Sequence, residues 1–469
     1  MTKRKTLITT GTRAITGVVI TAAAAVGALL LGTIPFPNAT SEPRAVQVDT
    51  TQAGARELVC AGAFGELGAD PSRPDVAVPV GSPSLTVSGN GELSELGLSE
   101  ADATSVAGAT VITGTMREPL AAAQVQKLSS ATLAGTVASS CVEPVNEQWL
   151  LGGESMLGYS TTLSLGNPGE VAATVHISVF DENGQIDDRQ TSGVIVAPNS
   201  QQVISLNGYA PDSERFAVRI TSTGAPVGAS LGIAQVDGIN AVGVATVTQQ
   251  VRAATVSVIP GVANDISGNH EPLPSDDGPV DPFPLRVQAI TPGTASGTAH
   301  VYAIDAAGTR TDLGTIEVVP GTLGELEVKS WPQSATAVVV ESDVPVYTAA
   351  GGATNDDTVY DFDWFTPAPA VAADTELRAA VVSGGILFIA NTGSAPANVT
   401  VSASDADAEP QTLEVAAGSS VAVDVTGAVT IESSAPVSAG VRILGGGAIA
   451  GYPVIPSSEP ASELTVYTR

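Results

Sequence analysis

The sequence predicts an all-β protein built from tandem β-sandwich modules behind one N-terminal transmembrane helix. One strand-and-turn pattern occurs three times along the chain, and one long uncharged run lies near the N-terminus. Hydrophobic residues make up 43% of the sequence but aromatic residues only 4%, and Val, Ala, Thr and Ser are abundant. This composition favours thin sandwich cores over helical bundles.

The three copies of the pattern run over residues 163–233, 285–352 and 387–443. In each copy the first strand stops at a turn, which reads Asn167-Pro168-Gly169, Thr291-Pro292-Gly293 or Asn391-Thr392-Gly393. In each copy a later strand meets a Pro-Val pair, which is Pro226-Val227, Pro345-Val346 or Pro436-Val437. Turn residues supply backbone angles that a strand lacks, and proline suits strand starts and edges. Three matches in the same order predict repeated modules.

The N-terminus predicts a membrane anchor. Residues 1–13 carry four cations and form a basic cytoplasmic tail, and residues 14–34 are uncharged. A helix of this second segment would measure about 32 Å, enough to cross a bilayer. The positive flank predicts that everything after residue 34 lies outside the cytoplasm. A cleaved signal peptide, with small residues at 39–41, is the alternative, and it would place the rest of the chain in the same compartment.

The only two cysteines, Cys60 and Cys141, predict a disulfide, because an even pair outside the cytoplasm is normally oxidised. The bond would close a loop worth roughly 4–5 kcal/mol by the chain-entropy estimate. It lies in residues 46–145, which lack a clear copy of the pattern. We therefore expect a separate N-terminal β domain there.

The remaining boundaries follow from the repeats and from shifts in composition. They predict a first module at 146–262, a Pro/Asp-rich linker at 263–284, a second module at 285–368, a third module at 375–456 and a tail at 457–469. Within the tail, residues 464–467 could add a final edge strand.

The charge excludes one class of partner. The 19 Lys and Arg residues, less the four in the N-terminal tail, leave 15 against 48 Asp and Glu, a formal charge of −33 for the exterior part. Nucleic acid is not an expected partner, because its binding depends on cations that neutralise phosphates. The charge indicates solubility and repulsion from an anionic wall or membrane surface, and a more specific interpretation is a preference for basic protein partners or divalent cations.

One segment stands out as a candidate binding site. It reads NDDTVYDFDWF and gathers acids and aromatic residues that are otherwise sparse: Asp356, Asp357, Tyr360, Asp361, Phe362, Asp363, Trp364 and Phe365. Carboxylates can coordinate Ca²⁺ or accept hydroxyl groups of sugars, and aromatic rings can stack on sugars or enter a partner's pocket. The alternative is a joint between modules, with the aromatic residues buried and the acids solvated. Trp149 and Trp331, near other module ends, favour that joint.

Catalytic signals are weak. Residues 228–232 read GASLG and match the G-x-S-x-G motif of serine hydrolases, with Asp265 and His270 later in the expected order. That motif needs a strand leading into a helix, whereas strand and turn are predicted here. The chain has three histidines, His176, His270 and His300, and two of them lie in predicted strands of different modules. We expect no enzyme activity, no cofactor and no metal centre.

The first module, with its LSLGNPGEVAATVHISVF, VIVAPNSQQVISL and VRITSTGAPVGAS stretches, resembles repeats in an uncharacterised family of membrane-anchored extracytoplasmic proteins of actinobacteria. The resemblance covers most of the chain and implies Ig-like β-sandwich modules in a cell envelope. It implies no functional residues. The third module departs from it by replacing the Asn-Pro turn with Asn391-Thr392.

Together these observations predict a non-enzymatic scaffold or interaction protein of the cell envelope, with an envelope protein or glycan as its partner. A carbohydrate-binding or accessory component of envelope polysaccharide assembly is the alternative function, and a hydrolase built on Ser230 is a weaker one. The alternative architecture is a β-propeller, whose closure would bring the cysteine-containing start beside the last strands.

Overall fold

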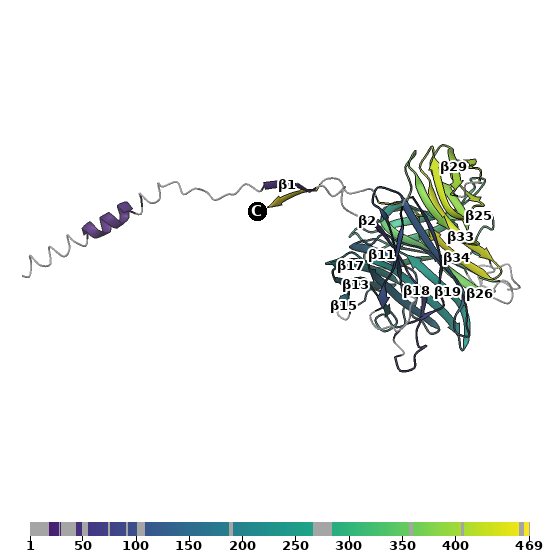
Figure 1. The fold of residues 1–469 in the computed structure, drawn as a ribbon, viewed down its shortest axis with the longest axis horizontal. Helices are drawn as coiled ribbons and strands as arrows, with labels where there is room; N and C mark the ends of the chain where they lie inside the picture. Colours follow the sequence, from purple (N-terminus) through teal and green to yellow (C-terminus); the bar gives the residue numbers. More distant parts are fainter. Residues whose placement is uncertain are drawn as a thin grey trace, which may run out of the picture. The chain divides into compact units, whose positions relative to one another are not determined.

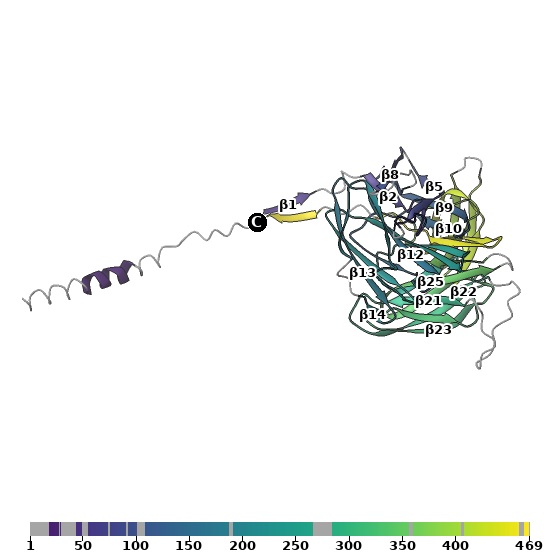
Figure 2. The same cartoon turned by 90° about the horizontal axis from the view of Figure 1, so that it is seen from below.

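The computed structural model describes residues 18–27, 29, 44–48, 55–73, 76–90, 92–100, 108–186, 191–265, 284–355, 360–404, 408–458 and 464–468. The chain divides into two compact units. One unit comprises residues 1–53 with 461–469, and the other comprises residues 54–460. The larger unit contains all of the modules and is built almost entirely from strands (Figures 1 and 2). The predicted all-β class is therefore confirmed.

Four modules follow one another in the larger unit. The N-terminal module contains β2 (Ala55–Cys60), β3 (Phe64–Glu66), β4 (Val78–Val80), β5 (Ser84–Gly89), β6 (Ser94–Gly97), β7 (Ser99–Glu100), β8 (Thr110–Thr115), β9 (Leu120–Ser129) and β10 (Ala134–Ser140). The first module contains β11 (Glu147–Leu151), β12 (Tyr159–Asn167), β13 (Ala173–Asp181), β14 (Gly184–Gln185), β15 (Ser192–Val196), β16 (Ser200–Ser205), β17 (Ala217–Thr223), β18 (Gly228–Asp237) and β19 (Asn240–Thr248).

The second module contains β20 (Ala254–Pro260), β21 (Leu285–Ile290), β22 (Gly297–Asp305), β23 (Arg310–Val318), β24 (Gly324–Val328), β25 (Ala335–Asn355) and β26 (Tyr360–Phe365). The third contains β27 (Leu377–Val381), β28 (Ile386–Asn391), β29 (Ala397–Ala403), β30 (Gln411–Val415), β31 (Ser419–Val423), β32 (Gly427–Ser433), β33 (Ser438–Gly445) and β34 (Ala448–Pro453).

Each module pairs its strands into two antiparallel sets. In the first module one set runs β11-β17-β13 and the other runs β19-β18-β12-β16. The third module repeats this order as β27-β32-β29-β30 and β34-β33-β28-β31. Apolar side chains from both sets share one core, such as Leu165 of β12 and Ile220 of β17. Burial of alternate residues on each strand is what the Val-rich, period-two sequence predicts.

The recurring turn has a common chemical basis. The Asn167 side chain accepts a hydrogen bond from the Gly169 N–H at 2.9 Å, and Asn391 accepts one from Gly393 at the same distance. In the second module the Thr291 hydroxyl accepts the Gly293 N–H at 3.1 Å. A short polar side chain that binds the backbone two residues on closes such a turn. The turn therefore depends on its first residue, so the loss of proline in the third module leaves it intact.

The N-terminal module is a fourth copy of the strand order. Its sheets run β2-β8-β6 and β10-β9-β5, the same succession as in the first module. We expected no copy here. The strand order is hidden in the sequence because the strands after β6 are replaced by the two-residue β7, which pairs with β16 of the first module. The predicted disulfide is confirmed, and it joins Cys60 at the end of β2 to Cys141 directly after β10.

The predicted boundary between the first and second modules is wrong. Strand β20 lies before the predicted linker, yet it pairs with β25 of the second module. The strand β25 is long enough to serve both sheets of that module, because its first half pairs with β22 and its second half with β21 and β26. The Pro/Asp-rich segment at 263–284 is therefore an insertion within the second module, and most of it lies outside the described residues.

The last strands of the four modules pack in a cyclic order. β10 packs against β19, β19 against β26, β26 against β34, and β34 returns to β10. Figure 1 labels β19, β26 and β34 near one another. The start of the chain thus lies beside the last strands, as closure of a propeller would require, although each module contributes two sheets where a propeller blade has one.

The smaller unit contains one described strand pair. β1 (Arg44–Val48) pairs antiparallel with β35 (Leu464–Thr468), so the two terminal segments of the chain bind each other. Among the residues that the structure describes, no helix has both the length and the apolarity needed to cross a bilayer. Of the predicted span at 14–34, only residues 18–27 and 29 are described, so the anchor stays a prediction.

Candidate functional site

The acidic and aromatic segment singled out in the sequence forms β26. This strand is one of the four, β10, β19, β26 and β34, that pack in cyclic order and are called the inner ring below. Phe362, Trp364 and Phe365 are at most 9% exposed, and Asp361 and Asp363 are fully buried. Tyr360 is half-buried, and Asp356 and Asp357 lie outside the described residues. Most of the described segment is thus covered by the protein. Its predicted role in ligand binding stays a prediction.

Asp361 binds all three neighbouring modules. Its carboxylate accepts backbone N–H groups from Thr136 of β10 at 2.9 Å, Val244 of β19 at 3.2 Å and Ile449 of β34 at 3.3 Å. Its own strand adds the N–H of Phe362 at 3.1 Å. One side chain of the second module therefore holds strands of the other three.

Asp363 repeats the arrangement two residues further along β26. It accepts the N–H of Thr246 of β19 at 3.4 Å and that of Gly451 of β34 at 2.6 Å. Residues two apart on a strand face the same side. We call Asp361 and Asp363 the central carboxylate pair.

The pair provides hydrogen-bond acceptors for backbone groups that the cyclic arrangement of β10, β19, β26 and β34 would leave unpaired. β10, β19, β26 and β34 each lie at the edge of a set of paired strands, so each has backbone groups without a partner in its own sheet. Burying such groups without partners costs free energy. Carboxyl oxygens can accept several N–H groups at once, so they match a ring of inward-facing donors.

Close approach of the backbones depends on glycine residues in the strands that neighbour β26. A Cβ atom on Gly135 of β10 would lie 2.4 Å from the Asp361 Oδ1 atom, and Gly135 has a φ of 138°. A Cβ atom on Gly451 of β34 would lie 2.6 Å from the Phe365 ring. Larger residues at either position would displace β26 from its neighbours.

Burial sets the protonation of the pair. It raises the pKa of Asp361 to about 7, against the lowering effect of the N–H donors. Burial also raises the pKa of Asp363, and the charge of Asp361 adds to this, again opposed by N–H donors. Both acids of the pair are therefore harder to ionise than exposed aspartates.

These pKa values predict that the protein loses stability as the pH rises. The folded-state pKa of Asp361 lies above its ordinary value of 3.8, so its stabilising contribution is complete below about pH 4 and is lost as the pH approaches about 7. Between these limits the group should remove about 1 kcal/mol of unfolding free energy per pH unit. Urea denaturation of the full chain between pH 5 and pH 8 measures this slope. The variant Asp361→Asn should show a shallower slope, and an unchanged slope would contradict the assignment.

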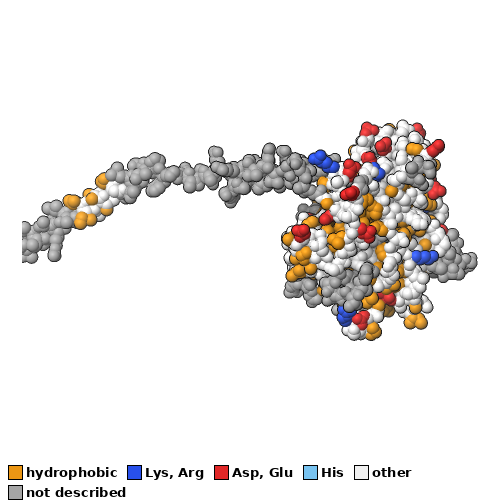
Figure 3. Space-filling model, in the orientation of Figure 1, with side chains coloured by type: hydrophobic (Ala, Val, Ile, Leu, Met, Phe, Trp, Pro, Cys, Tyr) orange, Lys and Arg blue, Asp and Glu red, His pale blue; other side chains and the backbone are white. Residues whose placement is uncertain are grey.

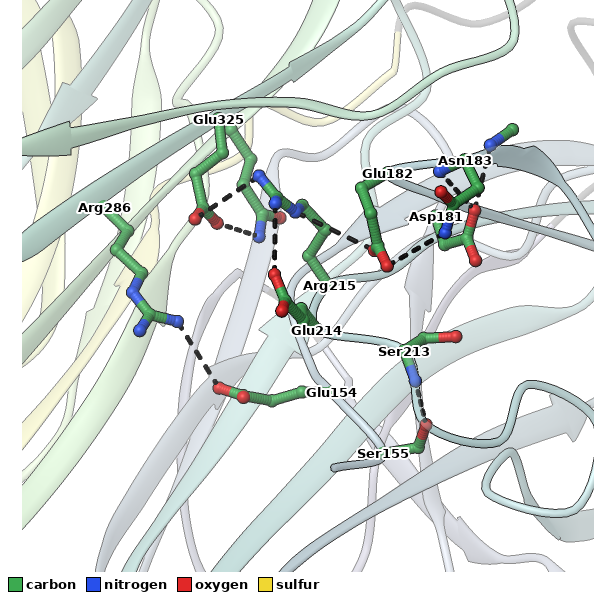
Figure 4. Close-up of polar contacts among 12 residues, drawn as sticks. Glu154, Ser155, Asp181, Glu182, Asn183, Ser213, Glu214, Arg215, Arg286 and Glu325 are labelled. Carbon is green, nitrogen blue, oxygen red and sulfur yellow. Dashed lines mark hydrogen bonds and ion pairs between the residues drawn. The ribbon is translucent and has the colours of Figure 1, made fainter. Parts of the chain in front are cut away.

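A second polar cluster joins the first and second modules (Figure 4). Arg215, just before β17, lies 3.4 Å from Glu214 and 3.5 Å from Glu325 of β24. Arg286 of β21 lies 3.8 Å from Glu154, in the loop after β11. Burial raises the pKa of Glu154 to about 7, and Arg286 opposes the shift. The cluster matches charges across the module boundary and gives that boundary a second group that titrates near neutral pH.

Aromatic rings reinforce the same boundary. Trp149 of β11 stacks between Phe180 at 5.2 Å and Tyr347 of β25 at 5.1 Å, measured between ring centroids. The ring of Trp364 lies so close to Gly152 that a Cβ atom there would be 2.7 Å away. Trp149 therefore packs at the boundary between the first and second modules.

Ser230 does not lie in a nucleophile elbow. It occupies a strand position within β18, where it pairs with Ser164 and Thr248 and no helix follows. The cavity beside it, between the N-terminal and first modules, measures about 10 Å³, roughly the space of one water molecule. His270 lies outside the described residues, and His176 and His300 lie on strands of different modules. In the part of the chain that the structure describes, no group of three or more His, Cys, Asp or Glu side chains is placed to hold a metal ion.

A larger hollow lies between the N-terminal and first modules. Its volume is about 350 Å³, and its walls include Glu66, Leu67 and Thr132 on one side and Tyr159 and Val236 on the other. The Tyr159 ring meets Phe362 edge to face, with 6.4 Å between ring centroids. The hollow therefore lies next to the aromatic side of β26.

The roles of Thr136, Val244 and Ile449 could not be predicted from the sequence, because these residues take part through backbone N–H groups that every residue except proline carries. It did contain one signal for the pair itself. In YDFDWF the two aspartates recur with period two among apolar residues, so both must lie on one face of a strand.

The comparisons identify the family of the chain. Residues 100–426 match the model of a family of unknown function, DUF5719. The match covers more than half of the chain, so the protein belongs to this family. No curated protein and no solved structure matches it significantly.

Proposed function

We propose that the protein is a non-enzymatic interaction scaffold of an actinobacterial cell envelope, exposed outside the cytoplasmic membrane and anchored through residues 14–34. The observation that carries the proposal is the use of the central carboxylate pair. Both aspartates are buried, and their carboxyl oxygens accept hydrogen bonds from backbone N–H groups of the three other modules. The pair therefore joins the modules, and few of its hydrogen-bonding positions remain for a substrate.

A locked ring of modules suits presentation of loops. Cores and inner strands fix the scaffold, and the connecting segments at its surface are free to vary and to bind. On the face drawn in Figure 3, acidic side chains are scattered widely and basic ones are few. An envelope protein with a basic surface fits this charge, which is formally −33 outside the N-terminal tail.

The disulfide supports the proposed compartment. Such bonds persist in oxidising surroundings and are rare in the cytoplasm. Both cysteines are buried, at 1% and 4% exposure, and the bond closes the N-terminal module. The two-sheet modules, with antiparallel strands around a shared core, are consistent with the Ig-like type that the resemblance implies.

The proposal is tested by crosslinking on intact cells of the native host. A membrane-impermeant crosslinker should join the tagged full chain to one or more envelope components, and cells without crosslinker serve as the control. The purified chain should also remain unlabelled by fluorophosphonate probes. Failure of the impermeant reagent to reach the chain would exclude the compartment, and labelling of Ser230 would restore the hydrolase hypothesis.

A further inference from the structure

Three aliphatic side chains project from two neighbouring turns of the first module. Leu157 is 100% exposed, Ile239 86% and Met156 38%. Leu157 and Ile239 are the two most exposed large hydrophobic residues of the larger unit among those that the structure describes. Single exposed aliphatic residues are common, but a contiguous group of them marks an interaction surface.

The backbone places these turns side by side. Tyr159 of β12 pairs with Gln235 of β18, and the Val236 N–H donates to the Gly158 carbonyl at 2.8 Å. Leu157 therefore precedes, and Ile239 follows, residues that are directly bonded. Gly158 and Gly238 carry φ angles of 95° and 62°, which fix both turns in conformations that favour glycine.

The hollow between the N-terminal and first modules continues this surface. Gly158, Tyr159 and Val236 belong to its wall, and the aliphatic side chains of Leu67, Leu133 and Ala234 complete its apolar part. The surface thus offers both projecting side chains and a recess of about 350 Å³. We call the two turns and the recess together the turn surface.

The charge around the turn surface is negative. Glu66 lines the recess, and Asp237 is exposed between Val236 and Ile239. None of the residues lining the recess is Lys or Arg. An occupant must therefore be apolar at its centre and basic at its rim, since unlike charges steer partners and like charges exclude them.

We propose that the turn surface docks a partner protein through aliphatic side chains flanked by Lys or Arg. The proposal rests on the proposed scaffold function and names the place and chemistry of its interaction. A protein partner fits better than an anionic lipid surface, which Glu66 and Asp237 would repel. It also fits better than a glycan, because the most exposed side chains of the surface, Leu157 and Ile239, are aliphatic.

Binding of defined probes to the full chain, held in lipid nanodiscs, tests the proposal. The main probe is a fluorescent ten-residue peptide in which leucine and lysine alternate. One control peptide replaces lysine by glutamate, and a second replaces leucine by serine. An oligosaccharide and phosphatidylglycerol vesicles test the other classes of occupant.

Only the leucine–lysine peptide should bind. The double variant Leu157→Ser with Ile239→Ser should weaken its binding by about tenfold or more, since both aliphatic contacts are lost. The variant Ile195→Ser is the matched control, because Ile195 is 65% exposed on β15, which pairs with β13 in the other sheet of the first module and does not line the recess. Its loss should leave binding unchanged. Thermal unfolding of each variant should match that of the parent chain, because the substituted residues are exposed.

Three outcomes would overturn the proposal: no binding of the leucine–lysine peptide, equal weakening by the Ile195 control, or binding of vesicles or oligosaccharide that depends on Leu157 and Ile239. The proposed function is judged separately in intact cells. Crosslinked envelope components that persist in the double variant would keep the scaffold and reject this surface. Absence of components in the parent chain would reject the scaffold itself.

Discussion

Replacing Asp361 by alanine should lower the free energy of unfolding of the full chain by about 3–6 kcal/mol. The substitution leaves the N–H groups of Thr136, Val244 and Ile449 buried without acceptors. Each unsatisfied buried group costs about 1–3 kcal/mol, and removal of a buried charge offsets part of that sum. Urea denaturation followed by tryptophan fluorescence measures the loss, since Trp364 lies on the same strand.

Two companion variants separate the causes. Asp343→Ala removes a carboxylate that accepts one backbone N–H, from Thr298, at an exposed site of the same module, and should cost about 1 kcal/mol or less. Asp361→Asn keeps the shape but turns an NH₂ group toward N–H donors, so it should also destabilise. If Asp361→Ala costs no more than the Asp343 control, the pair does not hold the modules together.

Loss of the disulfide is the second large effect. Replacing Cys60 and Cys141 together by alanine should lower the free energy of unfolding by about 4 kcal/mol, because the bond spans 81 residues of chain. The core of the N-terminal module is small, with Leu58, Ile112 and Leu120 among its main apolar residues. We therefore expect the disulfide to supply a large part of the stability of this module.

Because β10 of this module belongs to the ring, the loss should reach the other modules. We expect limited proteolysis of the double variant to cut first within residues 55–140, and the urea midpoint of the whole chain to fall. A reducing agent should lower the midpoint of the parent chain and leave that of the variant unchanged. A reduced parent chain that keeps its midpoint would show that the N-terminal module is held by its neighbours alone.

The modules were predictable because their turns depend on local chemistry, and the disulfide was predictable because the chain has two cysteines. Asn167, Thr291 and Asn391 close equivalent turns with their own side chains, and such signals survive in the sequence. The fourth copy was not recognised because the strands after β6 are replaced by the two-residue β7. The pairing of β20 with β25 could not be predicted, because strand pairing across an inserted segment produces no periodic pattern in the sequence.

The candidate segment could be identified from the sequence, but its burial and its hydrogen-bond partners could not. Acids and aromatic residues in residues 356–365 suggested a binding loop, with solvated acids as the alternative. In the structure the two described acids are the fully buried members, because three edge strands present N–H groups to them. A pattern of residue types cannot reveal acceptors needed by distant backbones. The same limit hid the contact between Glu154 and Arg286.

The cyclic order of the modules also has a consequence for biogenesis. The Ser140 hydroxyl donates to the Pro453 carbonyl, and Arg56 donates to the carbonyl of Ser458. The N-terminal module is synthesised first, but these partners lie more than 300 residues later in the chain. The formation of such long-range contacts is slow. The inner ring must therefore remain incomplete until β34 has been synthesised. Chains that end early would expose those strands to proteases, so the ring itself distinguishes finished molecules from truncated ones.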